Sequence, residues 1–549
     1  LLIDIFFKGS TATDTSYRAA VVEYYPVQNF SASDAERAVE NVKNYGDLID
    51  GLQSLDIIVF PEWTITQGVS SAREKLAGIS VKVPDNSEEA TPCGNEAYPQ
   101  FFQDLSCLAQ THAAYLVANL LEKESCNSSG CASDGWNFYN TNVVFDRKGR
   151  IILRYRKFNP FGEAEMNITK EAETATFTTD FDVTFGTFIC FDILFEKPAL
   201  ELVRNGVKHI AFPTMWFSEL PFLTALQSQE MFAIENDVVF LAAGANSETR
   251  GSGGSGIYQG SLGAVKYDIV SNDGNRVIVA DVLKEWDSNT KLDYQGDADE
   301  TTDVDVLAEA LDGFTLLHDN LTEYHSYQML VEEDSQSFEH DEMKCEVSWK
   351  MSNTSFPQYH YDYSLFYYSG VRSFSGVRNG GVDVCAVVFC KDQENPADCG
   401  TRYAQYNTIQ WPYNIEELTI KANFTVSNSS IQFPNTLLSS IRPLNRSDYE
   451  WSSKYYEDGK IVERKITLLH PQNKLLVFGI YGRDFNRDGG YYEDGKIVER
   501  KITLLHPQNK LLVFGIYGRD FNRDGGSSVV SVNLFVVFIS LALFYKLAV

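Results

Sequence analysis

The chain has 549 residues, too many for a single hydrophobic core, so we expect two folded domains. Its 44% hydrophobic and 13% aromatic content suffices for packed interiors. The formal net charge of −29 repels phosphate backbones and anionic lipid surfaces, which argues against a nucleic-acid-binding protein.

The first residues form a short apolar run, Leu1–Phe7, followed by polar residues. This pattern is typical of the end of a secretory signal, with a first strand of the mature protein as the alternative. We assign residues 1–16 to a signal remnant and N-terminal tail.

Residues 17–290 alternate between strand-like and helix-like patterns, which predicts a layered α/β domain. The predicted strands are Tyr17–Tyr25, Asp56–Phe60, Ala114–Leu121, Thr141–Asp146, Ile151–Tyr155, Thr184–Phe191, Val207–Phe212 and Val238–Ala243. The predicted helices are Ser33–Leu52, Tyr98–Ala113, Pro198–Asn205 and Phe217–Glu235. The first of these helices opens with a capping box, formed by Ser33 and Glu36.

The second half has a different character, because acidic residues crowd Asp297–Asp305 and strand-like runs rich in Tyr, Phe, Asn and Gly follow. We predict a solvated connector and then a mostly β domain over residues 291–490. Tyr455–Gly490 and Tyr491–Gly526 are identical letter for letter. We interpret the copy at 491–526 as a duplication artefact or a very recent duplication rather than a functional tandem hairpin.

Residues 527–549 are expected to be a hydrophobic anchor signal. Val529–Val549 is almost wholly apolar and follows the small residues of Asp524–Ser528. This arrangement fits a cleaved signal for a glycolipid (GPI) anchor, with a single membrane span as the alternative. In both cases the folded domains face the outside of a cell.

Glycosylation acceptors and cysteines also indicate an extracellular protein. Eight Asn-x-Ser/Thr sequons are spread along the chain, at Asn29, Asn127, Asn167, Asn320, Asn353, Asn423, Asn428 and Asn445. The nine cysteines are Cys93, Cys107, Cys126, Cys131, Cys190, Cys345, Cys385, Cys390 and Cys399. In an oxidising compartment eight of them form four disulfides and one thiol stays free.

The cysteine spacing restricts the pairing without deciding it. Cys126 and Cys131 flank a short Ser/Gly loop and are a predicted pair. Cys385, Cys390 and Cys399 are expected to pair among themselves and with Cys345, in an order that the sequence leaves open. No spacing is typical of a zinc site, and we predict neither a metal nor an organic cofactor.

Three polar residues stand at the ends of strand-like segments in the first half: Glu62, Lys157 and Cys190. Because strand carboxyl ends are the ligand-binding edge of layered α/β domains, we expect them to converge on one pocket. A thiolate attacks an amide carbon, and a neighbouring ammonium lowers the thiol pKa. A carboxylate moves the protons, and the ammonium holds the oxyanion. Taken singly, each residue has an ordinary structural explanation, and only the combination predicts catalysis.

The surrounding blocks resemble the three signature motifs of the nitrilase, or carbon–nitrogen hydrolase, superfamily. These blocks are Phe60-Pro61-Glu62, Tyr155-Arg156-Lys157-Phe158-Asn159 and Phe188–Phe195. Cys190–Phe195, Phe212–Trp216 and Gly253–Tyr258 resemble its vanin/biotinidase branch. The resemblance covers residues 17–290 by motif. It implies an αββα layered sandwich followed by a smaller, mostly β C-terminal domain.

By this resemblance, Glu62 is the general base, Lys157 the transition-state stabiliser and Cys190 the nucleophile. The superfamily that the chain resembles also has a second glutamate that supports the lysine. Glu163 is the expected counterpart, with Glu165 as the alternative.

Trp216 and Tyr258 are expected to line the substrate pocket, with a core role for Trp216 as the alternative. Pro160 departs from the Leu that the family pattern leads us to expect, which puts the shape of the loop after Lys157 in doubt.

The nearest activities in the branch are hydrolysis of pantetheine to pantothenate and cysteamine, and hydrolysis of biotin amides. The anchor-like tail favours the first. The expected partner is a small amide, and the expected location is the cell surface or the extracellular medium.

Two other functional classes remain as alternatives. One is a catalytically silent interaction protein on the same fold. The other is a hydrolase with a different catalytic site. A serine hydrolase is disfavoured because no G-x-S-x-G motif is present. A Cys–His protease would need His209, which lies in the middle of a predicted strand.

Overall fold

The computed structural model describes residues 15–29, 31–66, 73–127, 131–287, 289–290, 304–340, 343–355, 357–456 and 459–488. The predicted signal remnant up to residue 14, most of the acidic connector, the second repeat copy and the anchor-like tail lie outside these ranges. The chain divides into two compact units, Leu1–Lys123 with Phe138–Tyr491, and Glu124–Asn137 with Tyr492–Val549. Except for Glu124–Asn137, which holds the Cys126–Cys131 disulfide, the described residues belong to the first unit.

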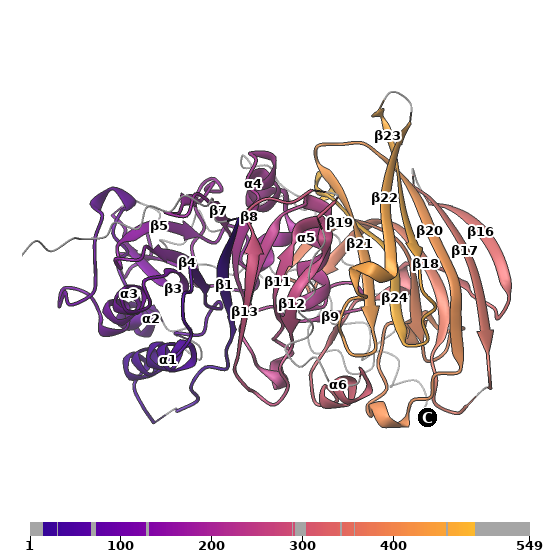
Figure 1. Ribbon diagram of the computed structural model, residues 1–549, viewed down its shortest axis with the longest axis horizontal. Coiled ribbons are helices and arrows are strands. Elements are labelled where there is room, and N and C mark those ends of the chain that lie inside the picture. Colours follow the sequence, from indigo (N-terminus) through magenta and orange to yellow (C-terminus); the bar gives the residue numbers. More distant parts are fainter. Residues whose placement is uncertain are drawn as a thin grey trace, which may run out of the picture. The chain divides into compact units, whose positions relative to one another are not determined.

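The first half of the chain forms two six-stranded mixed sheets (Figure 1). The first sheet, in spatial order, consists of β13 (Arg276–Leu283), β1 (Ser16–Glu23), β2 (Ile57–Val59), β3 (Tyr115–Ser125), β4 (Trp136–Phe145) and β5 (Ile151–Arg156). The second consists of β12 (Ala264–Asp268), β11 (Ser255–Gln259), β10 (Val239–Gly244), β8 (His209–Thr214), β7 (Thr184–Thr187) and β6 (Thr176–Thr178).

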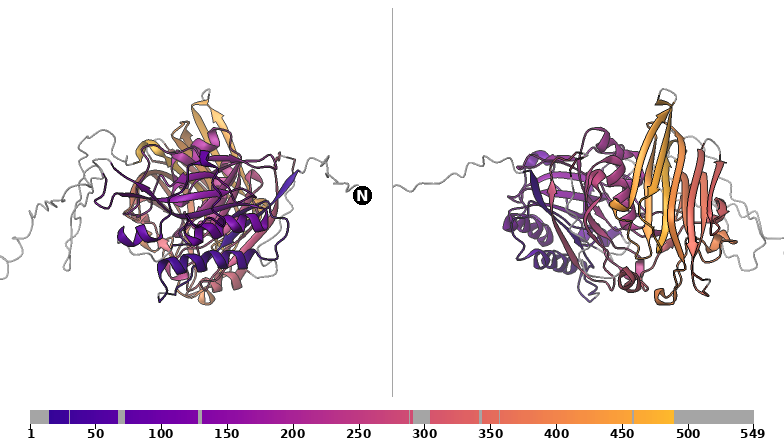
Figure 2. Two further views of the ribbon diagram at one scale, coloured as in Figure 1. Left: turned by 90° about the vertical axis from the view of Figure 1, so that its left-hand side faces the viewer. Right: turned by 45° about the vertical axis from the view of Figure 1, so that its right-hand side comes forward.

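The two faces of the first sheet pack against different layers, because side chains alternate along a strand. In β1, Ala20 and Val22 belong to the core shared with helices α1 (Asp34–Ile49) and α3 (Gln100–His112). Ala19 and Val21 belong to the core shared with the second sheet. Figure 2 (left) shows these helices lying over the outer face of the sheet. The capping box predicted at Ser33 is present at the start of α1.

The second sheet is covered by α4 (Glu201–Arg204) and α5 (Ala225–Asn236). Helix α5 is buried on nearly all sides, because the C-terminal half packs on its far face. Gln227 donates a hydrogen bond to Asn435 Oδ1 at 2.8 Å, and Trp451 Nε1 donates to Glu235 at 2.8 Å. The layered α/β sandwich is therefore confirmed.

The C-terminal half forms two five-stranded antiparallel sheets (Figure 2, right). One sheet consists of β15 (His325–Gln328), β18 (Asp362–Phe374), β19 (Arg378–Cys390), β24 (Leu475–Asp484) and β21 (Ser430–Leu438). The other consists of β16 (Glu333–His340), β17 (Met343–Asn353), β20 (Tyr413–Thr425), β23 (Ile461–Leu468) and β22 (Tyr449–Tyr456). The predicted mostly β domain is confirmed, whereas its boundary at residue 290 stays a prediction.

Smaller elements complete the described fold. They are α2 (Arg73–Ile79), α6 (Val304–Ala310) and the two-stranded parallel pair of β9 (Glu219–Leu220) and β14 (Leu317–His318). The first repeat copy supplies β23 and β24, and β24 lies between β19 and β21. Within the described ranges, none of the helices has the length and apolar character that a membrane crossing requires.

Two of the predicted elements start or end well inside their predicted bounds for a clear local reason. The helix predicted from Phe217 begins only at Ala225, because Pro221 has no N–H to continue a helix and Thr224 caps the new start with Gln227. The strand predicted over Thr184–Phe191 ends at Thr187. The chain then leaves the sheet and turns at Cys190.

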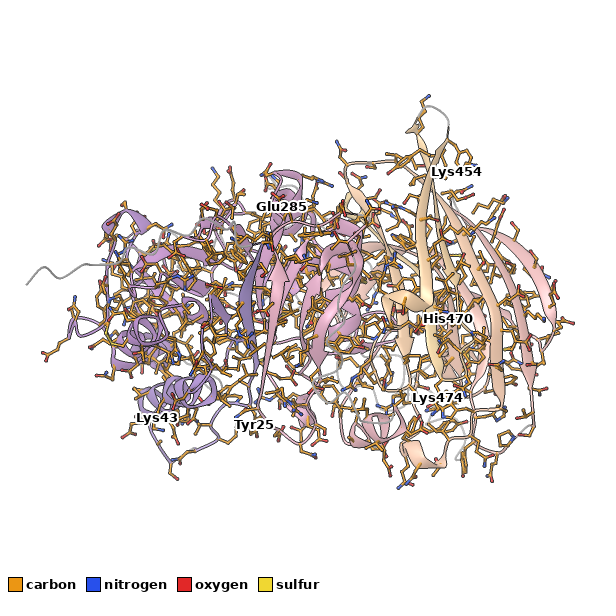
Figure 3. All side chains as sticks on the ribbon, in the orientation of Figure 1. Tyr25, Lys43, Glu285, Lys454, His470 and Lys474 are labelled. Atoms are coloured by element: carbon orange, nitrogen blue, oxygen red, sulfur yellow. A yellow bond between two sulfur atoms is a disulfide. The ribbon has the colours of Figure 1, made fainter. Side chains whose placement is uncertain are left out.

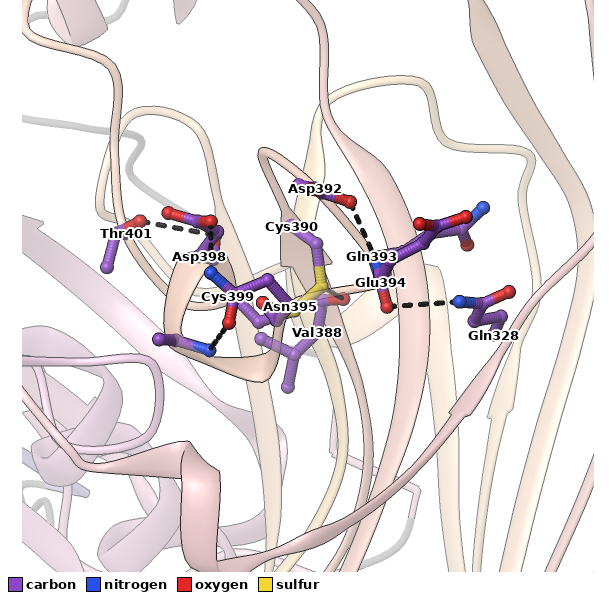
Figure 4. Close-up of a disulfide and its surroundings, with 11 residues drawn as sticks. Gln328, Val388, Cys390, Asp392, Gln393, Glu394, Asn395, Asp398, Cys399 and Thr401 are labelled. Carbon is purple, nitrogen blue, oxygen red and sulfur yellow. Dashed lines mark hydrogen bonds between the residues drawn. A yellow bond between two sulfur atoms is a disulfide. The ribbon is translucent and has the colours of Figure 1, made fainter. Parts of the chain in front are cut away.

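All nine cysteines lie in the described residues, and eight of them form four disulfides. The pairs are Cys93–Cys107, Cys126–Cys131, Cys345–Cys385 and Cys390–Cys399. The third pair joins β17 to β19 and so links the two C-terminal sheets. Figure 4 shows the fourth pair, next to the hydrogen bond from Asn395 to Asp398 at 2.6 Å. Cys190 is the free thiol.

We predict that Arg483→Met strongly destabilises the fold. The Arg483 guanidinium is fully buried and donates to Leu194 O at 3.0 Å, Asp488 Oδ1 at 2.7 Å and Gly381 O. Removing it leaves a largely buried carboxylate unpaired, so the free energy of unfolding should fall by about 3–5 kcal/mol in urea denaturation.

The matched control is Lys43→Met. Lys43 is a surface residue labelled in Figure 3, and its ion pair with Asp47 is exposed. Its loss should change the free energy of unfolding by only about 0–1 kcal/mol. Equal effects of the two substitutions would contradict the importance assigned to Arg483.

Candidate active site

Glu62, Lys157 and Cys190 follow β2, β5 and β7, respectively, and the fold brings them together in one buried place. Lys157 Nζ lies 2.6 Å from Glu62 Oε1 and 2.5 Å from Glu163 Oε1. All three predicted residues are buried, with 1%, 2% and 5% of their surface exposed in that order. The expected convergence of strand ends is therefore present in the structure.

Met215, just after β8, connects the thiol to the carboxylate. Cys190 Sγ lies 3.6 Å from Met215 O, and Met215 N donates to Glu62 Oε2 at 2.7 Å.

Cys190 has a φ of 46°, in the left-handed region that non-glycine residues rarely adopt. Strained backbone of this kind is held by its surroundings and concentrates at functional sites.

The structure distinguishes between the two glutamates considered for the lysine partner. Glu163 contacts Lys157 directly and also accepts a hydrogen bond from Asn140 at 3.1 Å. Glu165 instead lies 3.7 Å from Arg73. Glu163 therefore has the geometry of the supporting residue, although Pro160 lies in the intervening loop.

A chain of asparagines, which we did not identify from the sequence, holds the two carboxylates. Asn140 Nδ2 donates to Glu62 Oε1 at 2.7 Å as well as to Glu163. Asn119 Nδ2 in turn donates to Asn140 Oδ1 at 2.6 Å and to Asn142 Oδ1 at 3.1 Å. Asparagine in the interior of an apolar strand was the available signal, since buried amides need partners.

Asp192 is a second residue without a predicted role. Its carboxylate accepts hydrogen bonds from Ile189 N at 3.1 Å, from the Tyr155 hydroxyl at 2.7 Å, and from Asn159 N and Nδ2 at 2.8 Å each. These bonds tie the turn around Cys190 to the segment after Lys157. Burial raises the Asp192 pKa to about 6, against the lowering effect of these hydrogen bonds.

The electrostatics of the site differ from the sequence expectation. Burial and the Glu62 carboxylate raise the pKa of the Cys190 thiol above its usual range, although the Lys157 ammonium lowers it. Burial lowers the Lys157 pKa, but Glu163 and Glu62 more than offset this and keep the ammonium charged. Burial is the largest of these effects on the thiol, so the resting thiol is protonated.

Cys190 opens into a narrow apolar pocket of about 40 Å³, room for about three water molecules. The lining residues are Phe161, Cys190, Phe191, Leu194, Met215, Trp216, Phe217, Glu219, Leu223, Leu317, Phe374 and Ser375. Trp216 is one of these lining residues, and its Nε1 donates to Leu223 O at 2.8 Å. Tyr258 lies elsewhere, fully buried, and donates to Gln229 at 3.0 Å.

The part of the chain that the structure describes contains no group of three or more His, Cys, Asp or Glu side chains arranged to hold a metal ion.

Comparison with known proteins gives the family. Residues 18–282 match the carbon-nitrogen hydrolase family, and residues 314–488 match the vanin C-terminal domain. Vanin-like protein 1 of Drosophila melanogaster is 34% identical over 88% of this chain and 88% of its own. This chain belongs to the vanin branch of the carbon–nitrogen hydrolases. The pantetheinase of Bos taurus is also similar, at 30% identity over 88% of this chain and 92% of its own.

In this vanin-family chain, His209 packs in the core. Tyr17 OH lies 3.0 Å from His209 Nδ1, and His209 Nε2 lies 3.1 Å from Lys284 O. Burial lowers the His209 pKa from 6.5 to about 4, mainly by desolvation. Neither neighbour is Cys190.

We predict that His209→Asn removes a pH-dependent part of the stability and leaves the thiol chemistry intact. The His209 pKa is lower in the folded than in the unfolded chain, so the unfolded chain binds more protons between pH 4 and 6.5. The free energy of unfolding therefore rises as the pH increases through that range, by up to about 3 kcal/mol. Urea denaturation at pH 4.5 and 7 measures this difference. A lost reactivity of Cys190 towards iodoacetamide in the variant would instead indicate a Cys–His site.

Proposed function

We propose that this chain is an amidase that hydrolyses small linear amides, with Cys190 as nucleophile, Glu62 as general base and Lys157 as oxyanion stabiliser. The observation that carries this proposal is the free, buried thiol beside a carboxylate–ammonium–carboxylate cluster, in a chain whose other cysteines are all paired. Membership of the carbon–nitrogen hydrolases supports it.

Counting hydrogen-bonding groups supports these roles. A lysine ammonium has three N–H donors, and Glu62 and Glu163 take two of them, which leaves one for a substrate oxygen. The Glu62 carboxylate has about four acceptor positions, and Lys157, Asn140 and Met215 N occupy three. The fourth can take the thiol proton.

The reaction proceeds in two halves. Sγ of Cys190 attacks the amide carbon while Glu62 takes the thiol proton, and Lys157 and Phe191 N–H stabilise the oxyanion. The C–N bond then breaks, and the amine leaves with the proton from Glu62. Water, deprotonated by Glu62, attacks the thioester and releases the acid, which restores the thiol.

Pantetheine is the proposed substrate, giving pantothenate and cysteamine. Support comes from the similarity to proteins named pantetheinase, over most of both chains. The pocket also favours it, because the carbons on both sides of this amide are unbranched methylenes that suit a narrow apolar space.

We further propose an extracellular, glycosylated protein held at the cell surface by a lipid anchor. Four disulfides are typical of an oxidising compartment. Six of the eight sequon asparagines are exposed, and Asn353 and Asn423 are half-buried, which supports glycosylation at the exposed sites.

We predict that the full-length chain, expressed at the surface of a cell, releases cysteamine from pantetheine and that Cys190→Ala abolishes this release. The product is measured by thiol chromatography, with biotinyl-lysine offered in parallel. Lysine release in place of cysteamine would assign the biotin-amide activity. If a folded, glycosylated protein hydrolyses neither substrate, pantetheine is rejected. The chain is then either a scaffold or an enzyme for another amide.

We also predict that Glu163→Gln slows hydrolysis and lowers the thiol pKa. The substitution removes one negative charge from a cluster that carries two, so the ammonium is less neutralised and the thiolate is favoured. The pH dependence of Cys190 alkylation by iodoacetamide should shift to lower pH. Glu165→Gln is the matched control, and an equal shift there would refute the assignment of Glu163.

A further inference from the structure

The pocket beside Cys190 is not built by the catalytic half alone. The hairpin that joins β18 to β19 reaches it from the C-terminal half, and Phe374 and Ser375 at its tip line the same space as the thiol. Ser375 has a φ of 49°, in the left-handed region, so the tip holds an uncommon backbone conformation at this place.

Phe374 is fixed in position on both sides. Its ring is 2% exposed and packs edge-on against Phe191, the residue after Cys190, with centroids 5.8 Å apart. The guanidinium carbons of Arg372 and Arg483 lie 4.8 Å and 5.1 Å from its centroid. A ring enclosed in this way cannot move aside without breaking cation–π and packing contacts.

The hairpin itself is tied to the catalytic half. Arg378 donates to Asn159 Oδ1 at 2.6 Å, two residues after Lys157. Arg372 pairs with Glu219 and lies 2.8 Å from Asp319. The wall that Phe374 forms is therefore rigid relative to the thiol.

We propose that Phe374 determines specificity by limiting the substrate to amides whose carbon next to the reacting centre is an unbranched methylene. The reacting amide itself occupies the space of about 40 Å³ beside Cys190, so an added methyl group would meet the mostly apolar walls around it. The inference rests on the amidase function proposed above, because it takes this space as the place of the reacting amide.

Alkylation of the free thiol tests the proposal without requiring hydrolysis. The disulfide-bonded full-length chain is treated with iodoacetamide or with its α-methyl-branched analogue, 2-iodopropanamide. In each case Sγ forms a bond to carbon, iodide leaves and the thiol proton passes to the buffer. Mass spectrometry gives each rate for Cys190, and division by the rate for glutathione removes the intrinsic difference between the reagents.

The wild-type chain should discriminate against the branched reagent about tenfold more than glutathione does, the usual effect of one methyl group in a tight pocket. Phe374→Ala and the milder Phe374→Leu should lose most of this discrimination. Val377→Ala is the matched control, because Val377 is 41% exposed on the same hairpin and does not line the pocket. It should behave as wild type.

The proposal is overturned if wild type shows no extra discrimination, or if a folded Phe374 variant keeps it. A variant counts as folded if it forms the four disulfides and shows a cooperative melting transition. If Phe374→Ala does not fold, the result for Phe374→Leu tests the proposal. Absence of pantetheine hydrolysis together with intact, Phe374-dependent discrimination would reject only the proposed substrate. Failure of the proposed role of Phe374 and failure of the proposed substrate are therefore distinguishable.

Discussion

The charge cluster around Lys157 is the constraint on which the rest of the site depends. One ammonium and two carboxylates are removed from water, and each such group costs several kcal/mol unless it is paired and hydrogen-bonded. The pairing comes from Glu62 and Glu163, and the remaining acceptor capacity is met by Asn140 and the Met215 N–H. Polar residues inside otherwise apolar strands are thus a direct consequence of burying these charges.

The C-terminal half packs on the second sheet through helix α5, which lies between them. The β sheets of the C-terminal half cover α5, which is why that helix lacks an exposed polar face. Elsewhere between the two halves, the buried Arg483 donates to Leu194 O of the catalytic half and to Gly381 O of its own half.

A protected thiol follows from the same burial. In a chain with four disulfides, a free cysteine at the surface would exchange with them. Cys190 avoids this because it is buried and because its raised pKa keeps it protonated at rest. Its reactivity then depends on Glu62 receiving the proton when a substrate is in place.

Local patterns in the sequence were enough to predict the α/β layers, the capped first helix and the convergence of Glu62, Lys157 and Cys190 on one place. Strand ends, helix caps and motif blocks depend on residues that are neighbours in the chain, so the amino-acid sequence alone predicts them. The odd number of cysteines predicted the single free thiol for the same reason.

Tertiary structure alone decided which groups surround those three residues. Glu163 rather than Glu165 meets the lysine, Tyr258 lies outside the pocket, and Phe374 joins the wall from the other half of the chain. Each of these outcomes depends on the direction of a side chain or on contacts between segments separated by up to two hundred residues. No local pattern encodes such contacts, because they arise only when both segments have packed.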